Sequence, residues 1–238
     1  MKPEYDLATM KMFSNHRVRS KWIGASLCCI VLVACAQAPV STSAACATPL
    51  DARVPNSCVV VAQTLWRGAR PDKVAAEALV QLGAKTVVNL ELLSDDKAAF
   101  QDANFPQADA RESGYFRAPD WEPLAVMAPK EVDEHVARFL AIARTQPGPI
   151  YVHCRSGQNR TGIMVAAYRV FNGTSIDDAI ADMKGYGGIW FEHDATYVRS
   201  LTPQRRGELE AQISAWIPRL RRDATVLCAN GKCTVASN

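Results

Sequence analysis

A cysteine and an arginine, Cys154 and Arg160, are the residues of this chain best suited to chemistry. They lie in the run YVHCRSGQNRTG, between an apolar segment at 150–152 that predicts a strand and a segment at 163–171 with helical apolar spacing. A loop between strand and helix directs its backbone N–H groups, and the positive end of the helix, toward one point. That field suits a phosphate and favours a thiolate at Cys154 over a thiol. The run therefore predicts a phosphate-binding loop with a cysteine nucleophile.

Two other features of the run support this interpretation. Arg160 carries a planar fork that can bind two phosphate oxygens at once, and Gly157 allows a backbone turn that a side chain would obstruct. The simplest alternative is a buried strand cysteine beside an unrelated arginine.

The pattern HC-x-x-G-x-x-R-T at 153–161 resembles the signature of the cysteine-dependent protein tyrosine phosphatases, and the short chain resembles their dual-specificity branch. Upstream, LWRGARP at 65–71 resembles the strand and turn near the start of such domains. KTVVNL at 85–90 resembles their next parallel strand, whose end faces the active site. The resemblance covers residues 58–200, and the order of its motifs argues against the low-molecular-weight phosphatases, whose Cys-x5-Arg lies near the N-terminus.

The resemblance implies a two-step phosphoryl transfer that uses neither a metal nor a cofactor. Cys154 would attack phosphorus to form a cysteinyl-phosphate, while Arg160 and the loop N–H groups hold the phosphate oxygens. Thr161 would donate a hydrogen bond to the departing thiolate, and His153 would orient the loop from behind. The residues expected to bind substrate are Arg155, Ser156, Gly157, Gln158, Asn159 and Thr161.

A carboxylic acid is also required, first to protonate the leaving oxygen and then to activate water. The segment FRAPDWEPL lies between a predicted strand and helix, where the family places its mobile acid loop. Asp120, 34 residues before Cys154, is the expected acid, although the usual Trp-Pro-Asp order is absent. Glu122 and, more distantly, Asp109 are the alternatives, together with a solvated turn residue that has no catalytic role.

The composition of the loop bears on the substrate. Only Arg155 is basic between Cys154 and Arg160, whereas polyphosphorylated inositol headgroups favour a strongly basic loop. A phosphotyrosine-type monoester, on a protein or a small molecule, is therefore the first expectation, and inositol phosphates or phosphoinositides the second. Two other classes stay open: a rhodanese-like sulfurtransferase, which also uses a cysteine in an anion-binding loop, and an inactive phosphate-binding module.

The N-terminal segment indicates export. Basic residues between Lys11 and Lys21 precede the apolar run Trp22–Ala34, which is short for a membrane span and fits a secretory signal. The run ends in Leu-Val-Ala-Cys, which resembles the lipobox of bacterial lipoproteins. By that resemblance residues 1–34 are removed, and a lipid on Cys35 anchors the protein in a membrane. The protein would face the periplasm, and the outer membrane is the more expected of the two membranes. Ordinary cleavage near Ala45 and retention as a short anchor are the alternatives.

The leader also accounts for the charge of the chain, which is formally +3. Residues 1–34 carry five basic and two acidic residues, so residues 35–238 carry 22 of each and have no net charge. No basic stripe with interleaved aromatic residues is visible, which makes nucleic acid an unexpected partner.

The rest of the chain predicts a single α/β domain with a central, mostly parallel sheet flanked by helices, and we expect a monomer. Strands and helices alternate along it. Thr202-Pro203 begins a last helix with an apolar stripe, which is most simply explained as core packing. The stripe consists of Leu209, Ile213, Trp216, Ile217 and Leu220. The expected strands are 58–67, 85–90, 115–118 and 150–152, and the expected helices before the last are 73–82, 97–103, 129–145 and 163–171. The expected parts are a tether at 35–57, the catalytic domain at 58–223 and a hairpin tail at 224–238.

The cysteines agree with an oxidising compartment. In CANGKC, Asn-Gly predicts a two-residue hairpin turn that places Cys228 opposite Cys233, within disulfide range. Cys46 and Cys58 could form a second bridge, which leaves Cys154 as the free thiol. A zinc site is less expected, because Cys228 and Cys233 have no second pair or nearby histidine.

Overall fold

The computed structural model describes residues 46–103, 114–120, 127–220, 224–229 and 232–237. The chain divides into two compact units, Met1–Val40 and Ser41–Asn238. All described residues belong to the second unit. The predicted leader and Cys35 therefore lie outside the described residues. Within the described ranges, no helix is long and apolar enough to span a membrane.

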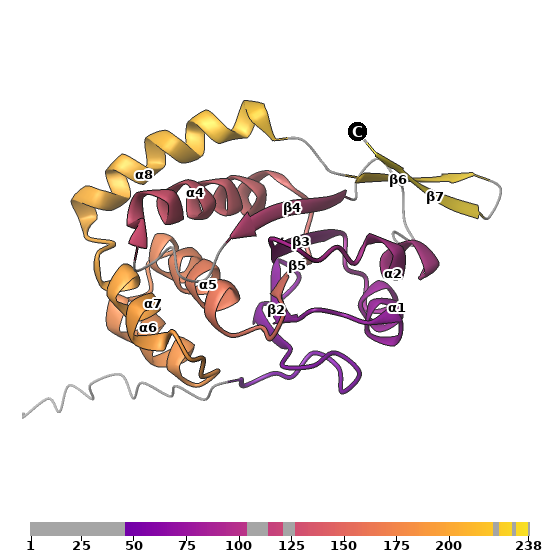
Figure 1. Cartoon of the computed structure of the whole chain (residues 1–238), viewed down its shortest axis with the longest axis horizontal. Helices are drawn as coiled ribbons and strands as arrows, with labels where there is room; N and C mark the ends of the chain where they lie inside the picture. Colours follow the sequence, from indigo (N-terminus) through magenta and orange to yellow (C-terminus); the bar gives the residue numbers. More distant parts are fainter. Residues whose placement is uncertain (1–45, 104–113, 121–126, 221–223, 230–231, 238) are drawn as a thin grey trace, which may run out of the picture. The chain divides into compact units, whose positions relative to one another are not determined.

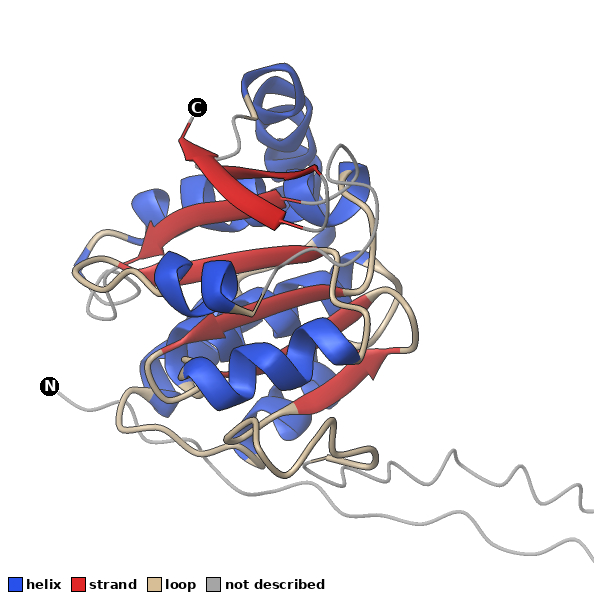
Figure 2. Cartoon of the chain, turned by 90° about the vertical axis from the view of Figure 1, so that its right-hand side faces the viewer, coloured by secondary structure: helices blue, strands red, loops and turns tan. Residues whose placement is uncertain are grey.

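A seven-stranded sheet forms the centre of the second unit, in the order β1-β2-β5-β3-β4-β6-β7 (Figure 2). The four strands β2, β5, β3 and β4 are parallel, and β1, β6 and β7 extend the two edges in antiparallel pairing. The predicted mostly parallel α/β sheet is thus confirmed. The strands are β1 Cys58–Val61, β2 Leu65–Ala69, β3 Thr86–Glu91, β4 Gly114–Asp120, β5 Ile150–Cys154, β6 Ala224–Ala229 and β7 Lys232–Ser237.

Helices cover both faces of the parallel strands (Figure 1). Strand side chains alternate between the faces, so Tyr151 packs in one core with α1 while Ile150 and Val152 pack in the other with α4 and α5. The helices are α1 Lys73–Gln81, α2 Lys97–Asp102, α4 Pro129–Thr145, α5 Asn159–Phe171, α6 Ile176–Lys184, α7 Phe191–Arg199 and α8 Pro203–Trp216, followed by the 3-10 helix Ile217–Arg219.

Three element predictions need correction. The strand expected at 58–67 is two antiparallel strands, because the chain reverses between Val61 and Leu65, where Gln63 has a φ of 56°. The helix after the catalytic strand begins at Asn159, four residues before the apolar pattern becomes visible. The last α-helix ends at Trp216, and Ile217, expected in its apolar stripe, begins a 3-10 helix and is 42% exposed.

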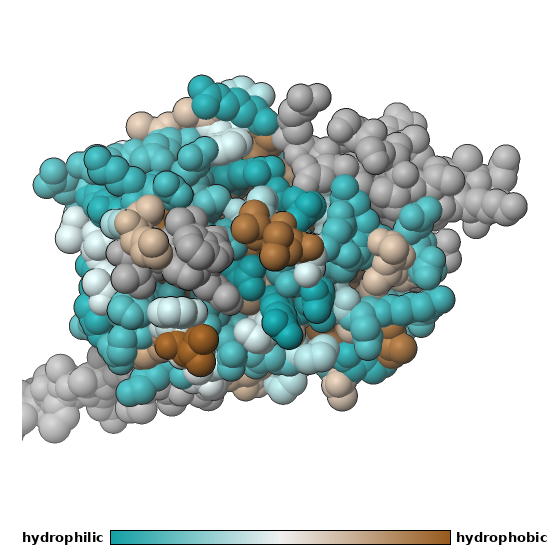
Figure 3. Space-filling model, in the orientation of Figure 1, coloured by the Kyte–Doolittle hydropathy of each residue, from teal (hydrophilic) through white to brown (hydrophobic). Residues whose placement is uncertain are grey.

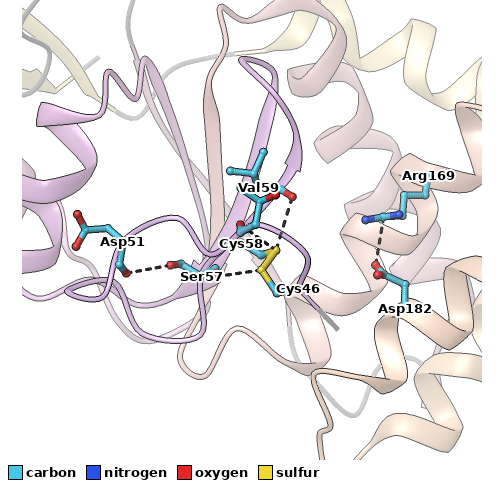
Figure 4. Close-up of a disulfide and its surroundings, with 8 residues drawn as sticks. Cys46, Asp51, Ser57, Cys58, Val59, Arg169 and Asp182 are labelled. Atoms are coloured by element: carbon cyan, nitrogen blue, oxygen red, sulfur yellow. Dashed lines mark hydrogen bonds and ion pairs between the residues drawn. A yellow bond between two sulfur atoms is a disulfide. The ribbon is translucent and has the colours of Figure 1, made fainter. Parts of the chain in front are cut away.

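Residues 46–57 are not a tether. Val54 is buried, and the backbone N–H of Ala69 donates to Pro55 O at 2.9 Å. A disulfide between Cys46 and Cys58 closes this segment against the start of β1 (Figure 4). The folded domain therefore begins before the boundary expected at Cys58.

The C-terminal hairpin extends the sheet instead of standing apart from it. Its strand β6 pairs with β4, with Ala224 opposite Tyr115. Within the hairpin Cys228 lies opposite Cys233, in the register that the Asn-Gly turn predicts. The turn itself and the side chains of both cysteines lie outside the described residues.

Most of the surface is hydrophilic on the face shown in Figure 3, which carries small, separate hydrophobic patches. Scattered exposed apolar side chains are normal for a folded domain. The large hydrophobic side chains that the described residues expose are Val61, Val74, Leu82, Leu92, Leu93, Met127, Ile189 and Ile217.

Candidate active site

The predicted phosphate loop lies at the edge of the sheet where all four parallel strands end. Cys154 is the last residue of β5, opposite Ala69 at the end of β2. Arg160 lies in the first turn of α5. The neighbouring strands β3 and β4 end at Glu91 and Asp120, which lie opposite each other. Carboxyl ends of parallel strands are where α/β folds bind ligands.

A cavity of about 350 Å³ opens at this edge. It brings together the predicted site residues Arg155, Ser156, Arg160 and Asp120, and Cys154 is fully buried at the end of β5. The complete lining consists of Arg70, Glu91, Leu92, Leu93, Ser94, Asp120, Arg155, Ser156 and Arg160.

Gly157 allows the loop to pass close to β2. Its φ is +71°, a left-handed conformation that side chains disfavour. A Cβ at this position would lie 2.6 Å from the carbonyl carbon and oxygen of Gly68. The glycine identified in the sequence is thus required both by the turn and by the approach to the neighbouring strand.

The guanidinium of Arg160 is fixed by the ends of two strands. The side chain is 9% exposed, and Nη1 donates to Leu90 O at 3.3 Å and to Asp120 O at 3.4 Å. These bonds use the backbone of β3 and β4, so the position of the cation is set by the sheet. A guanidinium held in this way at a cavity wall is suited to binding phosphate oxygens.

The side chains of Gln158 and Asn159, two residues expected to bind substrate, form hydrogen bonds to protein groups. Gln158 Nε2 donates to Tyr186 O at 2.9 Å, and Asn159 Nδ2 donates to Asp194 Oδ2 at 2.7 Å. Both amides hold the loop against the segment around α7. What they can offer a phosphate is backbone N–H groups.

Residues from outside the signature also hold the loop. Asn56 Nδ2 donates to Ser156 O at 2.9 Å, and Arg70 N donates to Arg155 O at 3.3 Å. Sequence patterns did not identify Asn56, because its segment reads as a polar linker and the contact spans 100 positions.

His153 is supported by a buried carboxylate that the sequence did not identify. His153 Nε2 lies 3.1 Å from Asp96 Oδ2. Asp96 also accepts hydrogen bonds from Asn89 and Tyr115. Burial opposes its ionisation, but the imidazole and these hydrogen bonds together hold the pKa of Asp96 below its usual range. In the sequence Asp96 stands just before α2, where a polar residue is typical of an ordinary helix start. This position therefore could not identify Asp96 as the partner of His153.

Thr161 is buried in the first turn of α5, and its hydroxyl has no hydrogen-bond partner in the described part of the chain. The bond to the thiolate expected from the family pattern is therefore not formed here. A buried hydroxyl without a partner can donate when a new acceptor appears.

Asp120 is the last residue of β4 and not part of the loop that follows it. It is 3% exposed, lines the cavity, and its Oδ1 lies 4.0 Å from His135 Nε2. The alternatives Glu122 and Asp109 lie outside the described residues. Of the three predicted acids only Asp120 belongs to the described residues, and it shares the cavity with Arg160 and with a second carboxylate, Glu91.

A parallel sheet with a Cys-x5-Arg loop at its carboxyl edge defines a class of phosphatase domain. The family model described as DSP-PTPase phosphatase fused to NAD+ kinase matches residues 55–196. The chain belongs to this dual-specificity, cysteine-dependent phosphatase family.

One curated relative is the dual specificity protein phosphatase TpbA of Pseudomonas aeruginosa. It is 30% identical over 141 residues, which are 57% of this chain and 58% of the relative. The chain thus matches less than two thirds of that relative's length.

Two solved structures share the fold. The crystal structure of P. aeruginosa TpbA has a TM-score of 0.53 at 25% identity, covering 73% of this chain and 98% of that one. The core catalytic domain of the PP-IP phosphatase SIW14 from S. cerevisiae, in complex with citrate, has a TM-score of 0.54 at 14% identity, with the same coverage. The second likeness concerns the fold alone.

Proposed function

We propose that the protein hydrolyses phosphate monoesters through a cysteinyl-phosphate on Cys154. The observation that carries this proposal is the shared edge of the sheet, where Cys154 ends β5 and where a fixed guanidinium, Arg160, and a carboxylate, Asp120, line one cavity. Membership of the phosphatase family and the likeness to a dual specificity protein phosphatase support it.

In the first step the thiolate of Cys154 attacks phosphorus, a sulfur–phosphorus bond forms, and the bond to the leaving oxygen breaks. Arg160 and the loop N–H groups stabilise the charge on the oxygens in the plane of transfer. Asp120 gives its proton to the leaving oxygen. In the second step Asp120 takes a proton from water, the water oxygen attacks phosphorus, and the thiolate leaves with a hydrogen bond from Thr161.

We propose phosphotyrosine-type esters as the preferred substrates. Leu93 is 94% exposed and Leu92 51% exposed, and both line the cavity, where they offer apolar area to an aromatic ring. Arg70 is 3.4 Å from Glu91, whose carboxylate also lines the cavity. The three arginines of the lining stand beside two carboxylates, Glu91 and Asp120, so its net positive charge is small for a polyphosphorylated inositol.

The nucleophile is tested with Cys154→Ser in the full chain. We expect turnover of a phosphotyrosine peptide to be abolished and binding of the peptide to persist, because Arg160 and the loop amides remain. Wild-type activity should survive EDTA and be lost with vanadate. Turnover by the serine variant would overturn the mechanism, whereas binding by the wild type without turnover would favour an inactive module. Thiosulfate:cyanide transfer without phosphatase activity would favour a sulfurtransferase.

The substrate class is tested with Leu93→Lys. The matched control is Leu82→Lys, because Leu82 is also exposed but does not line the cavity. We expect kcat/KM for a phosphotyrosine peptide to fall about tenfold at Leu93 only, a loss of about 1.4 kcal/mol. Activity on an inositol polyphosphate should rise relative to the peptide. Equal effects of both lysines would remove the argument for an apolar rim.

We also propose that Cys35 is lipidated and anchors the domain on the periplasmic side of a membrane. Of the two membranes, we favour the outer one. The basic stretch, the apolar run and the LVAC sequence support this, and a disulfide between Cys46 and Cys58 suits an oxidising compartment. Native protein should partition with membranes and carry diacylglycerol mass at Cys35, and Cys35→Ala should block this. A soluble, unmodified N-terminus near Cys46 would indicate ordinary secretion.

A further inference from the structure

Arg67 is a charged residue buried inside an otherwise apolar strand. It is 1% exposed, and among the described residues it is the largest of the fully buried side chains. Its neighbour in β5 is Val152, two residues before Cys154. Side chains alternate along strands, and Leu65, Val152 and Cys154 all belong to the core that contains α5 and α6. Arg67 therefore faces the same side of the sheet as the cysteine.

The guanidinium of Arg67 lies directly against the phosphate loop. Nη2 donates to Gly157 O at 2.6 Å, and the guanidinium carbon lies 3.4 Å from the ring centroid of Tyr186. Nε and Nη1 are buried and have no hydrogen-bond partner among the described residues. The cation is thus placed by one carbonyl and one ring, a geometry typical of cation–π stacking.

No carboxylate in the described ranges pairs with Arg67. Asp182 on α6 is engaged by Arg169, whose Nε lies 3.2 Å from Asp182 Oδ2 (Figure 4). Tyr186 is neutral at ordinary pH, because burial raises its pKa. Burial lowers the pKa of Arg67 to about 10, so it stays protonated at neutral pH. The charged or titratable groups near it are Tyr186, Asp182, Cys154 and Arg169.

We propose that Arg67 is a second cation of the phosphate site, which from beneath the loop compensates the charge of the Cys154 thiolate and of a phosphate bound by the loop. An isolated buried charge is costly unless an opposite charge lies near it. Here the opposite charges are the Asp182 carboxylate, which Arg169 already pairs with, the thiolate and the ligand. Arg67 touches neither the reacting atoms nor the solvent, so it is a positioning residue that acts through the loop. This inference rests on the proposed function, because it requires Cys154 to form a thiolate.

Two variants in the full chain separate the charge of Arg67 from its hydrogen bond. Arg67→Lys keeps the charge, whereas Arg67→Gln keeps a donor for Gly157 O and loses the charge. The first readout is the pH at which half of Cys154 is a thiolate. It is obtained from the thiolate absorbance after subtraction of the absorbance of the same chain carrying Cys154→Ser. A second readout is the affinity for inorganic phosphate by calorimetry. Arg205→Gln is the matched control, because Arg205 is partly buried and pairs with Asp133 on α4.

We expect Arg67→Gln to raise the midpoint by about 1–2 pH units and to weaken phosphate binding about tenfold. Arg67→Lys and Arg205→Gln should stay close to the wild type. Equal shifts in the lysine and glutamine variants, or no shift in the glutamine variant, would overturn the role of the charge.

Should Arg67→Gln fail to fold, Tyr186→Leu serves as the second variant, because loss of the ring exposes the cation to solvent. Its midpoint is then expected to rise by a smaller amount, and an unchanged midpoint overturns the proposal. A wild type that forms the thiolate and binds phosphate without turnover would overturn the proposed function and leave the role of Arg67 standing. An active wild type with an unshifted glutamine variant would overturn the role of Arg67 alone.

Discussion

Replacing Gly157 by alanine should damage the phosphate loop far more than one methyl group suggests. The residue has φ +71°, a conformation that costs an L-residue about 1–2 kcal/mol. A Cβ there would lie 2.6 Å from the carbonyl carbon and oxygen of Gly68 and 2.8 Å from Ala69 N. These are backbone atoms of β2, so no rotamer change can relieve the overlap. The loop must therefore move away from the strand.

Gly83 and Gly173 provide matched controls for the backbone term. Their φ values are +92° and +93°, and a Cβ at either would meet no heavy atom within 4 Å. We expect alanine at these positions to lower the free energy of unfolding by about 1–2 kcal/mol. Gly157→Ala should lose a further 1–3 kcal/mol, roughly the usual cost of overpacking. Urea denaturation followed by tryptophan fluorescence measures both.

Activity gives the second measurement on the same variants. A loop displaced by about 1 Å should lower kcat on a phosphotyrosine peptide by about 100-fold, while Gly83→Ala and Gly173→Ala should keep the wild-type value. The reasoning is refuted if Gly157→Ala is no less stable than the two controls and retains full activity.

Three further perturbations test other parts of the site and the fold. Asp120→Asn should cut kcat on phenyl phosphate by about 10²–10⁴, with a much smaller loss on esters of acidic phenols; equal losses on both would assign the acid to another residue, such as Glu122. The double variant Cys46→Ser, Cys58→Ser, which opens a link across 12 positions, should lower the free energy of unfolding by about 3 kcal/mol, and an unchanged urea midpoint would contradict this. Because the folded-state pKa of Asp96 lies below its ordinary 3.8, the ionised carboxylate stabilises the fold above that value, and this contribution is lost as pH falls through the folded pKa. Asp96→Asn should therefore flatten the acid limb of the stability–pH curve in urea titrations, and an unaltered slope would show that the His153 pair contributes nothing there.

Local patterns were sufficient for the parts of the protein whose physics is local. The Asn-Gly dipeptide predicted the register that places Cys228 opposite Cys233, because a two-residue hairpin loop allows few pairings. The apolar segments of β3 and β5 indicated buried parallel strands, because helices on both faces of a sheet require continuous apolar runs. The spacing of Cys154, Gly157 and Arg160 predicted the strand–loop–helix arrangement that the structure has, and the phosphate-binding role stays a prediction.

Contacts between distant segments could not be derived in this way. Residues 36–55 look like a tether because they are rich in Ala, Ser, Thr and Pro. The burial of Val54 and the hydrogen bond from Asn56 to the loop nevertheless make residues 46–57 part of the domain. Gln158 and Asn159 are expected to bind substrate, and only the structure shows that their side chains form hydrogen bonds to residues 28 and 35 positions away. In each case the deciding partner is remote in sequence.

The sequence by itself predicted Cys154 as nucleophile, Arg160 as the arginine that accompanies it, and the α/β class, because each depends on residue type and short spacing. Only the tertiary structure decided that β4 carries Asp120 into the same cavity as Arg160, and that β2 carries Arg67 beneath Gly157. An arginine in a strand is ordinarily read as a solvent-exposed residue. Whether it is instead a buried cation depends on which loop packs over it, and that is fixed by the order of the strands in the sheet.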